Sequence, residues 1–156
     1  MVRKSSTALP SSANLTVEQM KAALPKLDRR IAELEGFDVG TVRRRFDPVP
    51  ETLAEKMNST LQEIFGHGTV EYNRYRVSSF DTLGISLGGR NETLQEIHAG
   101  YREGIESGLL KLRTIKELFL ERISDGMPSS DKPPTRSNII LSNGRKVFVF
   151  TDMTKA

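Results

Sequence analysis

The feature that most constrains the fold is one long helical pattern in the second half of the sequence. Between Glu92 and about Ile123, apolar side chains recur at spacings of three and four, which places them on one face of an α-helix. At about 1.5 Å per residue this helix is roughly 48 Å long, with Asn91 as its expected N-cap. The apolar band consists of Leu94, Ile97, Tyr101, Ile105, Leu109, Leu112, Ile115, Phe119 and Ile123. The sequence therefore predicts a mainly α-helical bundle with a very long C-terminal helix.

Three glycines lie beside this band at intervals of four residues. In a helix interior, Gly100, Gly104 and Gly108 each cost about 1 kcal/mol relative to alanine. Either the helix is locally weak, or the glycines form a groove that lets another helix approach closely. That partner is either the first helix of the same chain or the same helix of a second copy in a homo-oligomer. The candidate helix–helix interface consists of Gly100, Tyr101, Gly104, Ile105, Gly108 and Leu112.

The first helix is predicted to begin at a capping box. The Thr16 hydroxyl can accept a hydrogen bond from the backbone of Gln19, whose side chain can reach back to Thr16. Apolar residues then recur at helical spacing up to Leu34, and Gly36 is expected to end the helix with a positive φ. Pro25 interrupts the pattern, so we expect a kink or two short helices there.

Two more helical segments and a loop are expected before the long helix. Pro50 to Phe65 has an inward-facing apolar pattern, with Gly66 as its C-cap. Thr69 to Val77 is expected to form a short helix, and Ser78 to Arg90 a loop containing several glycines.

The chain divides into four parts by composition and pattern. Residues 1–14 are expected to be a mobile arm and residues 15–124 the helical bundle. Residues 125–137 are rich in proline and serine and are expected to be a linker. Residues 138–156 are expected to form a short β segment, in which two strands flank an Asn143-Gly144 turn.

Composition excludes several classes of function. The chain has no cysteine, so disulfides, thiolate zinc sites, iron–sulfur clusters and cysteine nucleophiles are excluded. No apolar run approaches the roughly 20 residues that span a bilayer, and no apolar stretch follows the first charged residues. The expected location is therefore cytoplasmic, with no membrane partner.

Three segments of the chain resemble a known family. They are Leu27-Asp28-Arg29-Arg30-Ile31-Ala32-Glu33-Leu34-Glu35-Gly36-Phe37-Asp38, Ile64-Phe65-Gly66-His67-Gly68-Thr69-Val70-Glu71-Tyr72-Asn73-Arg74-Tyr75, and Arg145-Lys146-Val147-Phe148-Val149. Over residues 15–150 the chain resembles the helical N-terminal region of predicted bacterial nucleotide-binding proteins with a C-terminal TIR-like domain. The resemblance implies that residues 138–156 contain the first strand of such a domain.

The resemblance also implies a function. Related TIR domains cleave NAD in anti-phage defence when an attached sensor is triggered. The chain departs from the family pattern at Thr151, before the positions of the nucleotide pocket and the catalytic carboxylate. We therefore expect a truncated product or an isolated region without catalytic residues, cofactor or enzymatic activity. The leading hypothesis is a non-enzymatic sensor or oligomerisation module that self-associates through the long helix.

The alternative hypothesis is a module that binds a nucleotide or a nucleic acid. The candidate ligand contacts are His67, Tyr72, Arg74, Tyr75 and Arg76. Stacking of a base on the tyrosines and phosphate contacts from the arginines are the chemistry that these residue types offer. The residues favour a second interpretation, in which the tyrosines share a helix face and pack on the long helix, and the arginines stay in solvent.

Other motifs carry weaker signals. His67 and His98 have no spacing typical of a metal site, and no metal is expected. The run Arg43-Arg44-Arg45 is either a solvated face or a phosphate contact. Gly88-Gly89-Arg90 precedes a helix N-terminus but lacks the lysine of a phosphate-binding loop.

Overall fold

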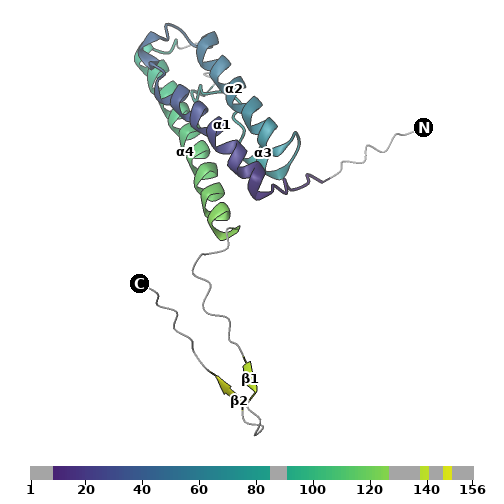
Figure 1. Cartoon of the computed structure of the whole chain (residues 1–156). Coiled ribbons are helices and arrows are strands. Elements are labelled where there is room, and N and C mark those ends of the chain that lie inside the picture. Colours follow the sequence, from purple (N-terminus) through teal and green to yellow (C-terminus); the bar gives the residue numbers. More distant parts are fainter. Residues whose placement is uncertain (1–8, 85–90, 127–137, 141–145, 149–156) are drawn as a thin grey trace, which may run out of the picture. The chain divides into compact units, whose positions relative to one another are not determined.

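The computed structural model describes residues 9–84, 91–126, 138–140 and 146–148. Its helices are α1 (Val17–Glu35), α2 (Pro48–Phe65), α3 (Val70–Tyr75) and α4 (Leu94–Gly126), with a 3₁₀ turn, η1 (Val39–Thr41), after α1. The strands are β1 (Asn138–Ile140) and β2 (Lys146–Phe148). Residues up to Ile123 form one compact unit, and residues from Ser124 form a second. Figure 1 shows α4 running along α1, so the predicted helical bundle with a long last helix is confirmed.

Helix α1 begins as the sequence predicts. The Thr16 hydroxyl accepts from the Gln19 amide at 3.2 Å, and the Gln19 side chain accepts from the Thr16 amide at 2.9 Å. Pro25 lies inside one continuous helix, so the division into two short helices is wrong. Pro25 is exposed, and the carbonyl that it leaves without a donor can be hydrated there. Gly36 has a φ of −81°, so the predicted positive φ is also wrong.

Helix α2 begins two residues earlier than predicted. The Asp47 carboxylate accepts from the Val49 amide at 3.0 Å, which makes Asp47 the N-cap and Pro48 the first helical residue. Gly66 ends the helix with a φ of 85°, as the sequence predicts.

Helix α4 begins later than predicted, because Thr93 rather than Asn91 forms the cap. The Thr93 hydroxyl accepts from the Glu96 amide at 3.2 Å, and the Glu96 carboxylate accepts from the Thr93 amide at 2.8 Å. This reciprocal pair is a capping box and satisfies two backbone donors at the start of the helix. Leu94 is 42% exposed, and the buried part of the apolar band begins at Ile97.

The core lies where α1, α2 and α4 meet. The Phe65 ring stacks on Tyr75 of α3 at 6.0 Å and meets the edge of Phe119 of α4 at 5.9 Å. The largest fully buried side chains are Tyr101, Phe80, Leu27, Met57, Leu61, Leu112, Ile115, Val42 and Pro50. Two of these, Val42 and Phe80, lie outside the helices, so connecting segments supply part of the core.

Residues 77–84, here called the crossing segment, cover the glycines of α4. The Asn58 side chain of α2 holds the start of this segment through two hydrogen bonds. Its Nδ2 donates to the carbonyl of Val77 at 2.7 Å, and its Oδ1 accepts from the Val77 amide at 2.9 Å. A Cβ atom on Gly104 would lie 2.0 Å from the backbone oxygen of Phe80, and one on Gly108 would lie 2.7 Å from the Phe80 ring. The glycines therefore do admit a second backbone at close range.

That backbone belongs to the same chain and is not helical. The predicted helix–helix interface is therefore corrected in position: its residues are buried within the monomer, with the crossing segment over the glycines. They are Gly100, Tyr101, Gly104, Ile105, Gly108 and Leu112. A second copy could reach the glycines only by displacing Phe80, which is fully buried.

The N-terminal segment is attached to α3. The Ser11 carbonyl accepts from the Val70 amide at 3.0 Å. The Ser12 hydroxyl and the Ala13 amide donate to the Glu71 carboxylate at 2.6 Å and 2.8 Å. The expectation of a mobile arm is therefore wrong for Ser11–Ala13, and residues 1–8 lie outside the described residues.

Strands β1 and β2 pair antiparallel, with Ile139 opposite Val147. The expected Asn143-Gly144 turn, most of the expected linker and residues 149–156 lie outside the described residues.

Candidate functional site

The residues proposed as ligand contacts do not converge on an open space. Tyr72 and Tyr75 are half-buried against the core, and Tyr75 stacks on Phe65. His67 is exposed, with its ring 5.7 Å from that of Tyr72. The side chains of Arg74 and Arg76 are exposed. The structure thus confirms the arrangement that the sequence favours, in which the tyrosines pack inward and the arginines stay in solvent.

A different set of residues gathers around the connection between η1 and α2. Val42 is buried, and its carbonyl accepts a 2.8 Å hydrogen bond from Nε2 of His98 on α4. His98 therefore anchors the connection. Three residues further along, Arg45 forms the second anchor.

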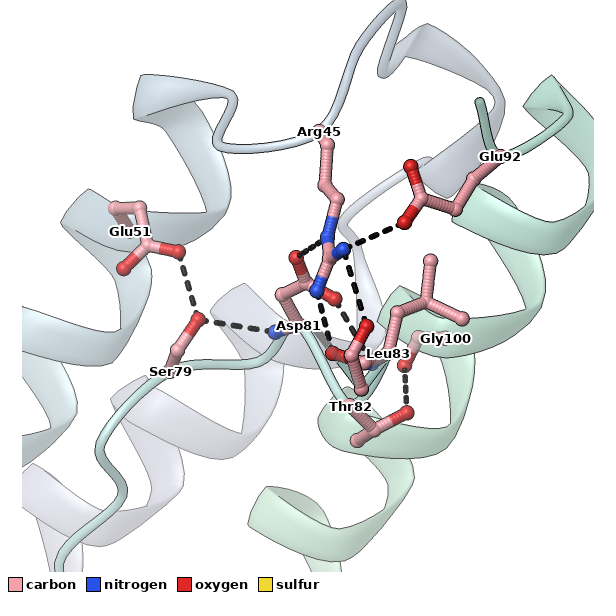
Figure 2. A network of polar contacts seen from close by, with 9 residues as sticks. Arg45, Glu51, Ser79, Asp81, Thr82, Leu83, Glu92 and Gly100 are labelled. Atoms are coloured by element: carbon pink, nitrogen blue, oxygen red, sulfur yellow. Dashed lines mark hydrogen bonds and ion pairs between the residues drawn. The ribbon is translucent and has the colours of Figure 1, made fainter. Parts of the chain in front are cut away.

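Arg45 is the centre of a polar network (Figure 2). Its Nε donates to Asp81 at 2.6 Å, its Nη1 donates to Glu92 at 2.7 Å, and its Nη2 donates to the carbonyl of Leu83. The side chains of Arg45 and Asp81 are 14% and 4% exposed. The hydrogen bond to Asp81, together with the charges of Asp81 and Glu92, raises the pKa of Arg45 despite its partial burial. Arg45 therefore stays charged and joins the connection to the crossing segment.

The network continues on both sides of Asp81. The Ser79 hydroxyl donates to Glu51 of α2 at 2.7 Å and accepts from the Asp81 amide at 3.0 Å. The Thr82 hydroxyl donates to the carbonyl of Gly100 on α4 at 3.1 Å. These bonds hold the crossing segment between α2 and α4. No periodic pattern in the sequence predicts these contacts, because Arg45 and Asp81 are 36 positions apart.

Phe46, next to this anchor, has the unusual geometry of the site. Its φ is 58°, and among the described residues it is the one non-glycine residue with a positive φ. For a bulky side chain this conformation costs about 1–2 kcal/mol. The ring is 70% exposed, with the Arg45 guanidinium 5.1 Å from its centroid. Phe46 is thus strained and outside the core at once.

Exposed cationic and apolar side chains accompany Phe46 on the same connection. Arg43 and Arg44 are exposed, and within the described part of the chain neither has an ion-pair partner. Val49, in the first turn of α2, is 53% exposed. Arg43, Arg44, Phe46 and Val49 are called the Phe46 patch below.

A groove lies beside η1, between the end of α1 and α4. Its volume is about 410 Å³. Its apolar lining residues are Leu34, Phe37, Val39, Ile105 and Leu109. Its charged residues are the carboxylates Glu35, Asp38 and Glu106 and the guanidinium Arg102. This groove, called the η1 groove below, therefore has a mixed apolar and polar lining, and its charged groups are mainly acidic.

Tyr101 lies in the core beneath this end of the molecule. Burial raises the pKa of its hydroxyl. The hydroxyl has no hydrogen-bond partner within the described residues. It is fully buried, so it is not part of the surface of the site.

The comparisons give no relative for this arrangement. No family model, no curated protein and no solved structure matches the chain. Over the described residues, no three His, Asp or Glu side chains are grouped as a metal site would require. None of the described helices has the length and the apolar character needed to cross a membrane. What defines the site is its surface: a basic and aromatic patch and, a few residues earlier in the sequence, a mainly acidic groove with a mixed apolar and polar lining.

Proposed function

We propose that this chain is a non-enzymatic helical module that binds another macromolecule through the Phe46 patch. The observation that carries the proposal is Phe46 itself, which is both strained at φ 58° and 70% exposed. Residues with strained backbones persist where the surrounding structure holds them, and they concentrate at functional sites.

The turn needs the positive φ, but it does not need a phenylalanine. The backbone at Phe46 carries the chain from the Arg45 anchor to the Asp47 N-cap. Glycine or asparagine adopts the same conformation at lower cost. The contact with Arg45 offsets only part of the difference, because a cation near an exposed ring is attracted weakly. A ring presented to solvent at this cost is best explained by a partner that covers it.

The resemblance to N-terminal regions of TIR-like proteins supports a place for this module in a defence protein. There it would act as the sensor or the assembly element of a nucleotide-binding, NAD-cleaving partner domain. The module itself is proposed to carry no reaction and no cofactor. Turnover of NAD by the purified chain above background would contradict this.

Replacing Phe46 by glycine tests the proposal. Phe46→Gly relieves about 1–2 kcal/mol of strain and costs up to about 1 kcal/mol through the entropy of the unfolded chain. We therefore expect a free energy of unfolding equal to that of the wild type or slightly higher, measured by urea denaturation. Phe46→Asn, which also tolerates this conformation, is the second variant and should behave alike. A loss of more than about 1 kcal/mol in both variants would show that the ring serves the fold.

A further inference from the structure

The structure suggests what covers the Phe46 patch. We infer that it is a second copy of this chain, whose η1 groove receives Phe46 while its carboxylates face Arg43 and Arg44. This inference rests on the proposed function, because it names the partner of the same patch.

The two surfaces are complementary, because one projects and the other is concave, and because they carry opposite charges. The patch offers one exposed ring and one exposed valine, flanked by Arg43 and Arg44, which lack ion-pair partners in the described part of the chain. The η1 groove, at about 410 Å³, has the size of a pocket for a small ligand and is lined by five apolar side chains. An aromatic ring that enters an apolar pocket while charges pair at its rim is the usual composition of an interface hot spot.

The charges of the groove favour arginines. Of its carboxylates, Glu35 already pairs with Arg113 at 2.5 Å, and Asp38 caps η1 through the Gly40 amide at 2.8 Å. Glu106 is exposed on α4 and has neither an ion pair nor a hydrogen bond within the described residues. Arg102 opposes the approach of Arg43 and Arg44, and Arg113 already neutralises Glu35, so Asp38 and Glu106 are the carboxylates left to attract the patch arginines. Glu106 is therefore the expected partner of the patch arginines.

A nucleic acid is the less favoured occupant. Affinity for a phosphate backbone grows with the number of cations that contact it. The patch has two arginines without a partner, because Arg45 is committed to Asp81 and Glu92. Asp38 precedes the patch in sequence, and Asp47 lies between Phe46 and Val49. An acidic protein surface with an apolar pocket suits such a patch better than a polyanion does.

Patch and groove belong to neighbouring parts of one chain. The groove includes Asp38 to Gly40 of the η1 region, and the patch begins at Arg43. Two copies related by a two-fold axis can therefore exchange the two surfaces reciprocally, so that each Phe46 enters the other copy's groove. The expected species is a dimer.

The test is sedimentation of the full chain from low micromolar to millimolar concentration. The wild type should form a dimer, and Phe46→Gly should bind itself at least about tenfold more weakly while its unfolding free energy is retained. Arg43→Glu combined with Arg44→Glu should weaken the dimer similarly. The matched control is Arg29→Glu combined with Arg74→Glu, at two other exposed arginines. It changes the net charge by the same amount and should leave the dimer intact.

Mixing two variants identifies the groove. Glu106→Arg alone should weaken the dimer, whereas Glu121→Arg, on the exposed surface of the same helix, should not. A mixture of Glu106→Arg with the Arg43→Glu, Arg44→Glu chain should associate again, because the reversed charges then face each other. Failure of this rescue overturns the assignment of the groove.

Two outcomes separate this inference from the proposed function. If the chain dimerises and the patch variants do not change its affinity, the inference is overturned, and the stability of Phe46→Gly still decides the proposed function. If the chain stays monomeric and a single-stranded oligonucleotide binds wild type but not Phe46→Gly, the patch is functional and its occupant is a nucleic acid. A chain that is monomeric and binds no oligonucleotide overturns the inference of a second copy.

Discussion

At the scale of single residues, a glycine and a phenylalanine occupy backbone conformations that their intrinsic conformational preferences disfavour. Gly104 lies inside a long helix, where alanine would stabilise the helix, because the Phe80 backbone occupies the space of a Cβ atom. Phe46 lies in a conformation that suits glycine. The glycine is explained by packing within the chain, whereas the phenylalanine is not, so the two exceptions have different causes.

Gly104→Ala is expected to destabilise the protein although it improves helix propensity. The added Cβ would lie 2.0 Å from a backbone oxygen that cannot rotate away. Overpacking of this severity lowers the free energy of unfolding by about 3 kcal/mol, and the higher helix propensity of alanine raises it by about 1 kcal/mol. We expect a net loss of about 2 kcal/mol in urea denaturation.

Gly84→Ala provides the control for this substitution. A Cβ at Gly84 meets nothing within 4 Å, so its effect should stay within about 0.5 kcal/mol. Equal stability of the Gly104 variant and the wild type would contradict the placement of the crossing segment.

At the scale of elements, the segments between helices are held by specific side chains. Arg45 and Asp81 fix the crossing segment from one side, and Asn58 fixes its start from α2. Glu71 of α3 fixes the N-terminal segment, because the Ser12 hydroxyl and the Ala13 amide both donate to it. These carboxylates and amides replace the helix-to-helix contacts that a simple bundle would have in the same places.

The attachment of the N-terminal segment should depend on pH. The hydrogen bond from Ser12, supported by that from Ala13, lowers the pKa of Glu71 from its usual value of 4.5. A lowered pKa in the folded state means that the contribution to stability is present above pH 4.5 and is lost as the pH falls through the folded value. We expect the amide resonances of Ala13 and Val70 to move toward unbound positions in this acidic range.

Glu71→Gln is the matched control for that titration. The amide keeps an acceptor for Ser12 but does not titrate, so the acidic change should disappear. A transition of equal size in the Glu71→Gln chain would assign the effect to another group.

At the scale of the whole molecule, the described chain separates into a helical unit and a short β unit. The helical unit contains every residue of the hydrophobic core that the structure describes. Its exterior ion pairs, such as Lys26–Glu63 and Lys116–Asp28, are exposed and add little. Stability is therefore expected to come from the packing of α1, α2, α4 and the crossing segment.

A chain that ends at Gly126 should fold as the full chain does. Its unfolding free energy is expected to agree with the full-length value within about 0.5 kcal/mol, because no described core residue is removed. A chain that ends at Lys111 is the control. It lacks the buried residues Leu112, Ile115 and Phe119 and should not fold cooperatively. A large loss in the longer chain would show that residues beyond Gly126 support the bundle.

The sequence alone predicted most of what depends on local periodicity and capping, although not the cap at Thr93 or the φ of Gly36. The helix bounded by Thr16, the C-cap at Gly66 and the apolar face of the long helix all follow from spacings of three and four or from one side chain and its own backbone. Only the tertiary structure decided which backbone covers Gly104, and that Arg45 reaches Asp81. It also placed Phe46 outside the core, whereas the sequence itself favours the inward packing of Tyr72 and Tyr75. The physical reason is that these contacts join residues far apart in the chain. The free energy of such contacts depends on how well two surfaces pack together, and this packing produces no repeating pattern in the sequence.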